Sequence, residues 1–141
     1  MRPPEGYSIR PFEPGDAPSL IAITVSAIRR LGPRHYSSEQ VAAWAARHPS
    51  PQRIIERAQN GSTILVASAK PSAAVAYCLI EIDREGDAHL DMLYCHHQHT
   101  RRGLAEALLA AAEEHARARR SSRIYTEASE LAQAAFERAG Y

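Results

Sequence analysis

The stretch HLDMLYCHHQHTRRGLAEALL, residues 89–109, decides the fold, because a strand pattern passes directly into a helix pattern within it. Residues 89–95 follow a period of two and are largely apolar, which indicates a β-strand. From Gly103 to about Arg119, apolar side chains recur at helical spacing and glutamates occupy the opposite side. The sequence therefore predicts a strand, a short loop and a long helix, in this order.

The junction between loop and helix carries the strongest chemical signal. Gly103 and Ala105 keep side-chain bulk away from the first turn of the helix, where backbone N–H groups have no partner inside the helix. These groups and the helix dipole favour an anion, and Arg101 and Arg102 add positive charge. Phosphate is the ligand that this arrangement suits. A plain junction with a small residue for close packing has the same spacing, so both interpretations stay open at this point.

Further strands and helices are predicted on both sides of this segment. Alternation and turn residues indicate strands at residues 7–12, 63–67, 74–82 and 123–127. Capping residues and apolar spacing indicate helices that begin after Asp16, at Ser37, after Pro51 and after Ser129. This order predicts one α/β (α+β) domain over residues 1–141, in which helices cover a mixed, mostly antiparallel sheet.

Composition excludes several classes of protein. A chain of 141 residues with 45% hydrophobic and 23% charged residues is typical of one globular domain. Seventeen basic and sixteen acidic side chains leave a formal charge of +1, too balanced for binding dominated by the nucleic-acid backbone. The two cysteines make no disulfide framework, and no apolar run approaches the ~20 residues that span a bilayer. We expect a cytoplasmic protein with neither nucleic-acid nor membrane partners.

Residues 90–109 resemble the acetyl-CoA-binding motif of the GNAT superfamily of N-acetyltransferases, in which a strand leads into Gln/Arg-x-x-Gly-x-Gly/Ala and a long helix. The six places of that motif are filled by TRRGLA, residues 100–105. The resemblance continues at both ends, through IRP at residues 9–11 with Asp16, and through FERAGY at residues 136–141. The segments HYS (residues 35–37), DML (residues 91–93) and TRRG (residues 100–103), together with Trp44, are most similar to the bacterial YafP-like subgroup.

This resemblance implies acetyl-CoA as cosubstrate and transfer of its acetyl group to a primary amine by direct attack in a ternary complex. The acceptor would be a small-molecule or peptide amine, and a homodimer is possible. The motif would hold the pyrophosphate through Thr100, Arg101, Arg102, Gly103, Leu104 and Ala105. The preceding strand would hold the pantetheine arm and thioester through backbone groups of Leu93, Tyr94 and Cys95. Ser129 stands where relatives have a cofactor-contacting Asn, and its hydroxyl is a candidate proton source.

Transfer to an amine needs a group that takes a proton from an ammonium whose pKa is near ~10. Strand alternation predicts two faces, one with His89, Asp91 and Leu93 and the other with Leu90, Met92 and Tyr94. Relatives use a carboxylate on this strand as base, so the resemblance favours Asp91, then His89, then Glu127 on the neighbouring strand. A polar side chain satisfied by a turn or helix end is the other interpretation of Asp91.

Three departures from the family pattern affect these expectations. Thr100 replaces the Gln or Arg that opens the motif, so a hydroxyl replaces one long polar contact. Phe136 stands where many relatives have the tyrosine that protonates the CoA thiolate, which favours an alternative function as a non-catalytic CoA-sensing or protein-binding module. The sequence stops at Tyr141, where the family continues into a final strand, so that strand is expected to be missing from the given chain.

Other chemistry is disfavoured by spacing. The segment CHHQH, residues 95–99, has the residue types of a zinc site, but His96 and His97 would point apart in an extended chain and no second cluster completes four ligands. We expect no metal, and we expect Cys95 to be a buried strand residue rather than a nucleophile. Tyr36 and Trp44 suit either an acceptor pocket or the packing of short helices. A non-CoA scaffold that binds another phosphate is a third possibility.

Overall fold

A computed structural model describes residues 2–31, 33, 36–47, 50–69 and 73–126. Their strands form one five-stranded sheet in the order β1-β2-β3-β4-β5. The first four strands are antiparallel, and β5 runs parallel to β4. The strands are β1 (Ser8–Pro11), β2 (Thr63–Ser68), β3 (Ala74–Ile82), β4 (Ala88–Cys95) and β5 (Ile124–Thr126). The predicted mixed, mostly antiparallel sheet is confirmed.

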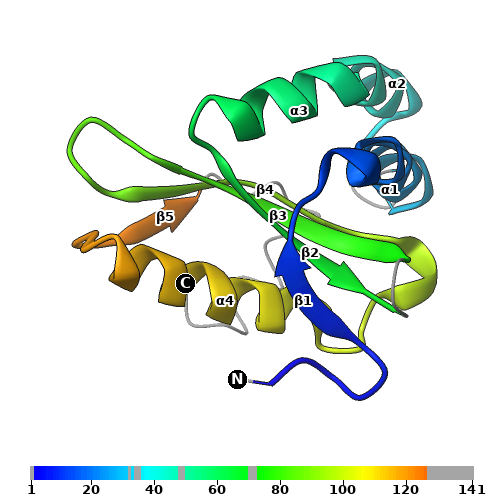
Figure 1. Ribbon diagram of the computed structural model, residues 1–141. Helices are drawn as coiled ribbons and strands as arrows, with labels where there is room; N and C mark the ends of the chain where they lie inside the picture. Colours follow the sequence, from blue (N-terminus) through cyan, green and yellow to red (C-terminus); the bar gives the residue numbers. More distant parts are fainter. Residues whose placement is uncertain (1, 32, 34–35, 48–49, 70–72, 127–141) are drawn as a thin grey trace.

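Helices cover both faces of this sheet (Figure 1). The helices are α1 (Ala17–Leu31), α2 (Ser38–Arg47), α3 (Pro51–Gln59) and α4 (Leu104–Ala118), with 3-10 turns η1 (Pro14–Asp16) and η3 (His97–His99). The first three lie on one face and α4 on the other. No helix among the described residues is long and apolar enough to cross a membrane. The helix predicted after Ser129 lies outside the described residues.

Local sequence signals explain where the helices begin. The predicted capping box precedes α2, because the amide of Ser37 donates to Gln40 Oε1 at 2.8 Å and the amide of Gln40 donates to Ser37 Oγ at 3.2 Å. At α3, the hydroxyl of Ser50 accepts from the amide of Arg53, and a proline occupies the first helical position. Helix starts that depend on neighbouring residues were therefore predictable.

Strand β3 is the centre of the molecule. Six of its nine residues are buried, and they form an unbroken run from Val75 to Ile80. Its side chains alternate between two cores. Cys78 and Ile80 pack with Leu104 and Leu108 of α4 on one face, and Tyr77 and Leu79 pack with α1 and α3 on the other. A strand covered on both faces is held rigidly, so side chains at its end are well positioned.

Strand β5 is tied to the hairpin between β3 and β4 by carboxylates. Asp87 accepts from the hydroxyl of Ser122 and from Arg123 Nε, both at 2.7 Å. Asp83 accepts from the hydroxyl of Tyr125 at 3.0 Å. These contacts fix the position of Ile124–Thr126 beside β4.

Asp16 has a different role from the helix cap that the sequence predicts. Its carboxylate accepts two hydrogen bonds of 2.8 Å from the Arg10 guanidinium and a third, of 2.9 Å, from the amide of Glu13. It therefore closes η1 and joins this turn to β1. The hydrogen bond from Arg10 lowers the pKa of Asp16, although burial acts in the opposite direction.

We expect Asp16→Asn to reduce the free energy of unfolding at pH 7 by about 1–3 kcal/mol, because a charge-assisted bidentate pair becomes a neutral one. A lowered folded-state pKa means that the carboxylate stabilises the fold above its unfolded pKa of about 3.9, and that this contribution is lost as pH falls further. Urea unfolding of both proteins at pH 7 and pH 3 measures the difference. A difference that stays the same at both pH values would contradict this origin.

Candidate active site

The site begins with a β-bulge in β4. Leu79 of β3 pairs with Met92 and the next residue, Ile80, pairs with Leu90, so Asp91 is an extra residue without a partner on β3. The bulge changes which side chains share a face. Leu90 and Leu93 both pack toward α4, whereas Met92 packs toward α1.

The predicted division of β4 into two faces was therefore wrong after Asp91. Regular alternation assigned Leu93 to the face of His89 and Asp91, but Leu93 and Cys95 lie on the α4 side. Met92 and Tyr94 lie on the α1 side instead. The physical reason is the extra residue, because a strand's side-chain period of two shifts by one beyond it.

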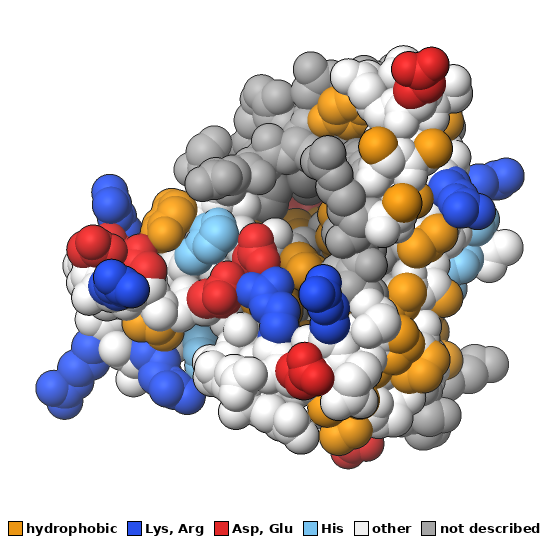
Figure 2. Space-filling model, turned by 90° about the horizontal axis from the view of Figure 1, so that it is seen from above, with side chains coloured by type: hydrophobic (Ala, Val, Ile, Leu, Met, Phe, Trp, Pro, Cys, Tyr) orange, Lys and Arg blue, Asp and Glu red, His pale blue; other side chains and the backbone are white. Residues whose placement is uncertain are grey.

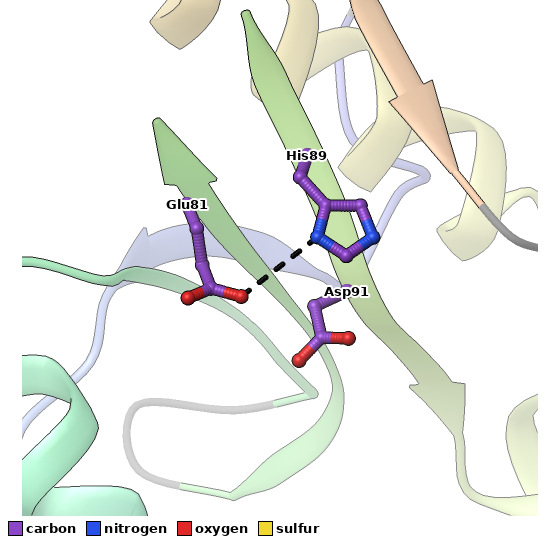
Figure 3. A group of neighbouring side chains, drawn as sticks. All are labelled: Glu81, His89 and Asp91. Atoms are coloured by element: carbon purple, nitrogen blue, oxygen red, sulfur yellow. Dashed lines mark ion pairs between the residues drawn. The ribbon is translucent and has the colours of Figure 1, made fainter. Parts of the chain in front are cut away.

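Asp91 belongs to a charged cluster that joins three elements. Arg57 of α3 places Nη1 2.7 Å from Asp91 Oδ2 and Nη2 2.7 Å from Glu81 Oε1 of β3. His89 lies two residues before Asp91, with Nδ1 3.8 Å from Glu81 Oε1. Figure 3 shows the side chains of Glu81, His89 and Asp91 directed toward the same space. The structure thus brings the first two predicted base candidates together.

The orientation of His89 is fixed from the other side. Its ring stacks on the ring of Tyr125, with centroids 4.9 Å apart and an interplanar angle of 15°. Tyr125 is itself held by Asp83, as described above. The imidazole therefore has a defined plane at the edge of the charged cluster. The space-filling view in Figure 2 looks onto this face, where acidic, basic and histidine side chains lie beside a hollow that contains hydrophobic side chains.

The charges of the cluster disfavour a metal ion. Ligand atoms of Glu81, His89 and Asp91 lie within 4.8 Å of one another, which is close enough for a shared cation. Burial lowers the pKa of Arg57, but the hydrogen bonds and charges of Asp91 and Glu81 outweigh it, and the pKa lies above its usual value. A permanent guanidinium charge between the two carboxylates would repel a metal cation.

Strand β5 pairs with the first part of β4. Among the described residues, β5 pairs with β4 only at Ala88, His89 and Leu90. Beyond Asp91, the strand pairs with β3 along one side. Backbone groups of an antiparallel strand point alternately to its two sides. The predicted thioester-binding residues Leu93, Tyr94 and Cys95 lie beyond Asp91, in the part of β4 that pairs with Cys78, Tyr77 and Ala76 of β3.

The predicted phosphate junction has the geometry of an open helix start. Gly103 is the N-cap of α4 and has φ 85°, a left-handed conformation that favours glycine. The first hydrogen bond within the helix runs from the amide of Ala107 to the carbonyl of Gly103 at 3.1 Å. The amides of Leu104 and Ala105 come before this bond, where a helix offers its N–H groups no carbonyl partner. Arg101 and Arg102 are exposed beside them. Thr100 Oγ donates to the carbonyl of His97 at 3.0 Å, so its proton is used within the loop.

The histidine segment differs from its extended prediction. The 3-10 turn η3 brings the rings of His96 and His97 into a stack with centroids 4.4 Å apart, so the expectation that they point apart was wrong. Their Nδ1 atoms have other partners, because that of His96 accepts from the amide of Gln98 and that of His97 bonds Ser26 Oγ. Burial raises the pKa of Cys95 to about 11, which disfavours a thiolate nucleophile.

Sequence reasoning missed Arg57 and Glu81. Glu81 had a weak signal, since it is the one charged residue in an otherwise apolar strand. Arg57 had none, because it is one charged helical residue among the many arginines of the chain. The candidates Glu127, Ser129 and Phe136 lie outside the described residues, as does the side chain of Trp44.

Tyr36 packs against a small apolar cluster between α1 and α2. A cavity of ≈ 360 Å³ also lies between these two helices, lined by side chains that include Val25, Arg29 and Val41. The α1–α2 pair therefore contains space for a small ligand as well as a packed core.

Comparisons with known proteins identify the family of the chain and agree with its fold. A family model described as an acetyltransferase (GNAT) domain matches residues 33–141. The chain is 31% identical over 134 residues to the uncharacterized N-acetyltransferase YafP of Escherichia coli (strain K12), covering 94% of this chain and 79% of that protein. A crystal structure of a GCN5-related N-acetyltransferase from Rhodopseudomonas palustris has a TM-score of 0.84 and 30% identity, covering 100% of this chain and 82% of the other. The PaiA N-acetyltransferase from Thermoplasma acidophilum, solved with coenzyme A, has a TM-score of 0.79 and 20% identity, covering 93% and 84%.

We expect Cys95 to react slowly with iodoacetamide at pH 8, because a thiol with a pKa of about 11 is only about 0.1% thiolate there. The rate should rise about tenfold for each pH unit up to pH 10. Peptide mass spectrometry distinguishes Cys95 from Cys78, whose pKa is raised to about 12 by burial. Fast alkylation of Cys95 at pH 8 would show that its thiol is activated.

Proposed function

The chain belongs to the GNAT family of acetyltransferases, and we propose that it moves the acetyl group of acetyl-CoA to a primary amine within a ternary complex. The observation that carries this proposal is the bulge at Asp91. The carboxylates of Asp91 and Glu81 lie together beside it, and the same strand leads through η3 to the open N-terminus of α4. A reactive end and a phosphate end are thus connected by one continuous segment.

The segment from β4 to α4 suits the cofactor in two parts. Backbone groups of Leu93, Tyr94 and Cys95 bind the pantetheine arm as an added strand would, and they direct the thioester toward the cluster. The amides at the start of α4 and the two exposed arginines before it bind the pyrophosphate. Thr100 contributes less than a long side chain would, since its hydroxyl is already bonded to His97.

The reaction requires a neutral amine at the thioester carbon. Its nitrogen attacks the carbonyl carbon, the new C–N bond forms, the C–S bond breaks, and the amine proton moves to a base. Asp91 is the favoured acceptor of that proton, through Oδ1, because Arg57 holds Oδ2. His89 is the second candidate. The CoA thiolate leaves readily, so water or a hydroxyl such as that of Ser129 suffices as its proton source.

The acceptor is a small-molecule or peptide amine that approaches from the α1–α3 face. The charged cluster opens on this side, and hydrophobic side chains lie in the hollow beside it (Figure 2). A cationic amine is attracted by the carboxylates of Glu81 and Asp91, which outnumber the single guanidinium between them.

Gly103→Gln should weaken acetyl-CoA binding at least tenfold, because a side chain is added where the cofactor approaches the helix start. The left-handed conformation of Gly103 also makes the substitution cost about 1–2 kcal/mol of stability. Gly86→Gln is a matched control, since Gly86 has the same φ of 85° in the β3–β4 turn, away from the junction. Titration calorimetry measures the Kd for acetyl-CoA of both variants. Equal affinities would place the phosphate site elsewhere.

Asp91→Asn should lower kcat by roughly 100-fold or more and leave the Kd for acetyl-CoA nearly unchanged, because the carboxylate serves the amine rather than the cofactor. Thiol release in the presence of a panel of amines is the measurement. Glu85→Gln is the control, since Glu85 is an exposed carboxylate in the β3–β4 turn. If the native protein binds acetyl-CoA but no amine accelerates its thiol release, the result would instead support a non-catalytic CoA-sensing module.

A further inference from the structure

The N-terminal segment packs against the phosphate junction. Residues 4–7 form a turn in which the amide of Tyr7 donates to the carbonyl of Pro4 at 3.1 Å. A Cβ atom added to Gly103 would lie 3.5 Å from Cγ of Pro4. Figure 1 shows this segment passing beside the first turn of α4 on its way into β1. Residues from opposite parts of the sequence therefore share this surface.

A directed chain of hydrogen bonds joins the two segments. Arg102 Nη1 donates to the hydroxyl oxygen of Tyr7 at 3.0 Å, and this hydroxyl lies 2.8 Å from His99 Nδ1. An arginine can only donate, so the Tyr7 oxygen accepts from it, and the Tyr7 hydroxyl keeps its own proton for a bond to His99 Nδ1. The rings of Tyr7 and His99 also meet edge to face, with centroids 5.7 Å apart.

The imidazole of His99 is suited to accept this proton. Burial lowers the pKa of His99 below its ordinary value, and the charges of Arg102 and His96 lower it further. The lowered pKa favours the neutral ring, and in the tautomer that carries its proton on Nε2 the Nδ1 atom accepts from the Tyr7 hydroxyl. The hydroxyl of Tyr7 is held in one orientation, with a lone pair directed at Arg102.

This contact restrains an arginine at the edge of the proposed cofactor site. Arg102 is exposed and immediately precedes the N-cap of α4. An exposed arginine without a partner samples many rotamers, and binding an anion then costs conformational entropy. Tyr7 uses one of its five N–H donors and leaves the others for an anion.

We propose that Tyr7 is a positioning residue for acetyl-CoA, which holds the Arg102 guanidinium ready for the pyrophosphate at the start of α4. This inference rests on the proposed function, because it assumes that the cofactor binds there. It adds a residue from the N-terminus of the chain to a site otherwise formed by residues 93–105. Tyr7 acts through Arg102 and needs no contact with the cofactor itself.

The test is a double-mutant cycle on CoA affinity. Tyr7→Phe keeps the ring packing and removes the hydroxyl, and it should raise the Kd for CoA about three- to tenfold. The KM for acetyl-CoA should rise by the same factor while kcat changes less than twofold. Arg102→Gln should also weaken binding, and adding Tyr7→Phe to it should cause no further loss. Tyr125→Phe, which removes a hydroxyl of β5 that donates to Asp83, should leave the Kd for CoA unchanged.

Two results would overturn the inference. In the first, the Tyr7→Phe protein binds CoA with the affinity of the native protein. In the second, Tyr7→Phe weakens CoA binding by the same factor in the native protein and in the Arg102→Gln protein. Thermal unfolding of each variant, measured without CoA, separates a folding defect from a binding defect, because the predicted coupling concerns affinity in the folded protein. Different results would contradict the proposed function. If the native protein does not bind CoA, or if Gly103→Gln binds it normally, the site itself is wrong, whereas normal binding by Tyr7→Phe alone removes only the role of Tyr7.

Discussion

One extra residue in β4 determines how the site is arranged. Asp91 has no partner on β3, and the strand must bend and twist to accommodate it. This single irregularity changes the faces of the side chains that follow it. Met92 and Tyr94 lie on the side of α1, and Leu93 and Cys95 turn to the side of α4, which is the reverse of what regular alternation from His89 would give.

The bulge is tolerated because its surroundings are rigid. β3 is buried on both faces and supplies Glu81 from its end. The backbone that carries the Glu81 carboxylate, which binds Arg57 together with Asp91, is therefore fixed in position. α3 supplies Arg57 from a helix whose start is fixed by Ser50. The hairpin carboxylates hold β5 and, through it, the ring that orients His89. The cluster is thus built on regular elements, which is what precise positioning requires.

The sequence predicted what depends on neighbouring residues and missed what depends on distant ones. Strand and helix ends were within about two residues, and the capping box at Ser37 was correct, because the interactions that set them span three or four positions. The bulge was missed, since Asp91 continues a regular alternation in the sequence and only the pairing with β3 reveals the shift. Arg57 and Asp91 lie 34 positions apart, and Arg102 and Tyr7 lie 95 apart, so no local pattern could have joined them.

The charge of the Arg57 cluster argues for the kind of ligand that it can accept. Glu81 and Asp91 carry two negative charges and Arg57 one positive charge, so the group has a net charge of −1 when His89 is neutral. A divalent metal ion would need the guanidinium expelled from two hydrogen bonds of 2.7 Å before it gained its ligands. An ammonium group needs only the remaining lone pairs of the carboxylates, and it neutralises the cluster without displacing anything. The same arrangement that disfavours a metal therefore favours an amine.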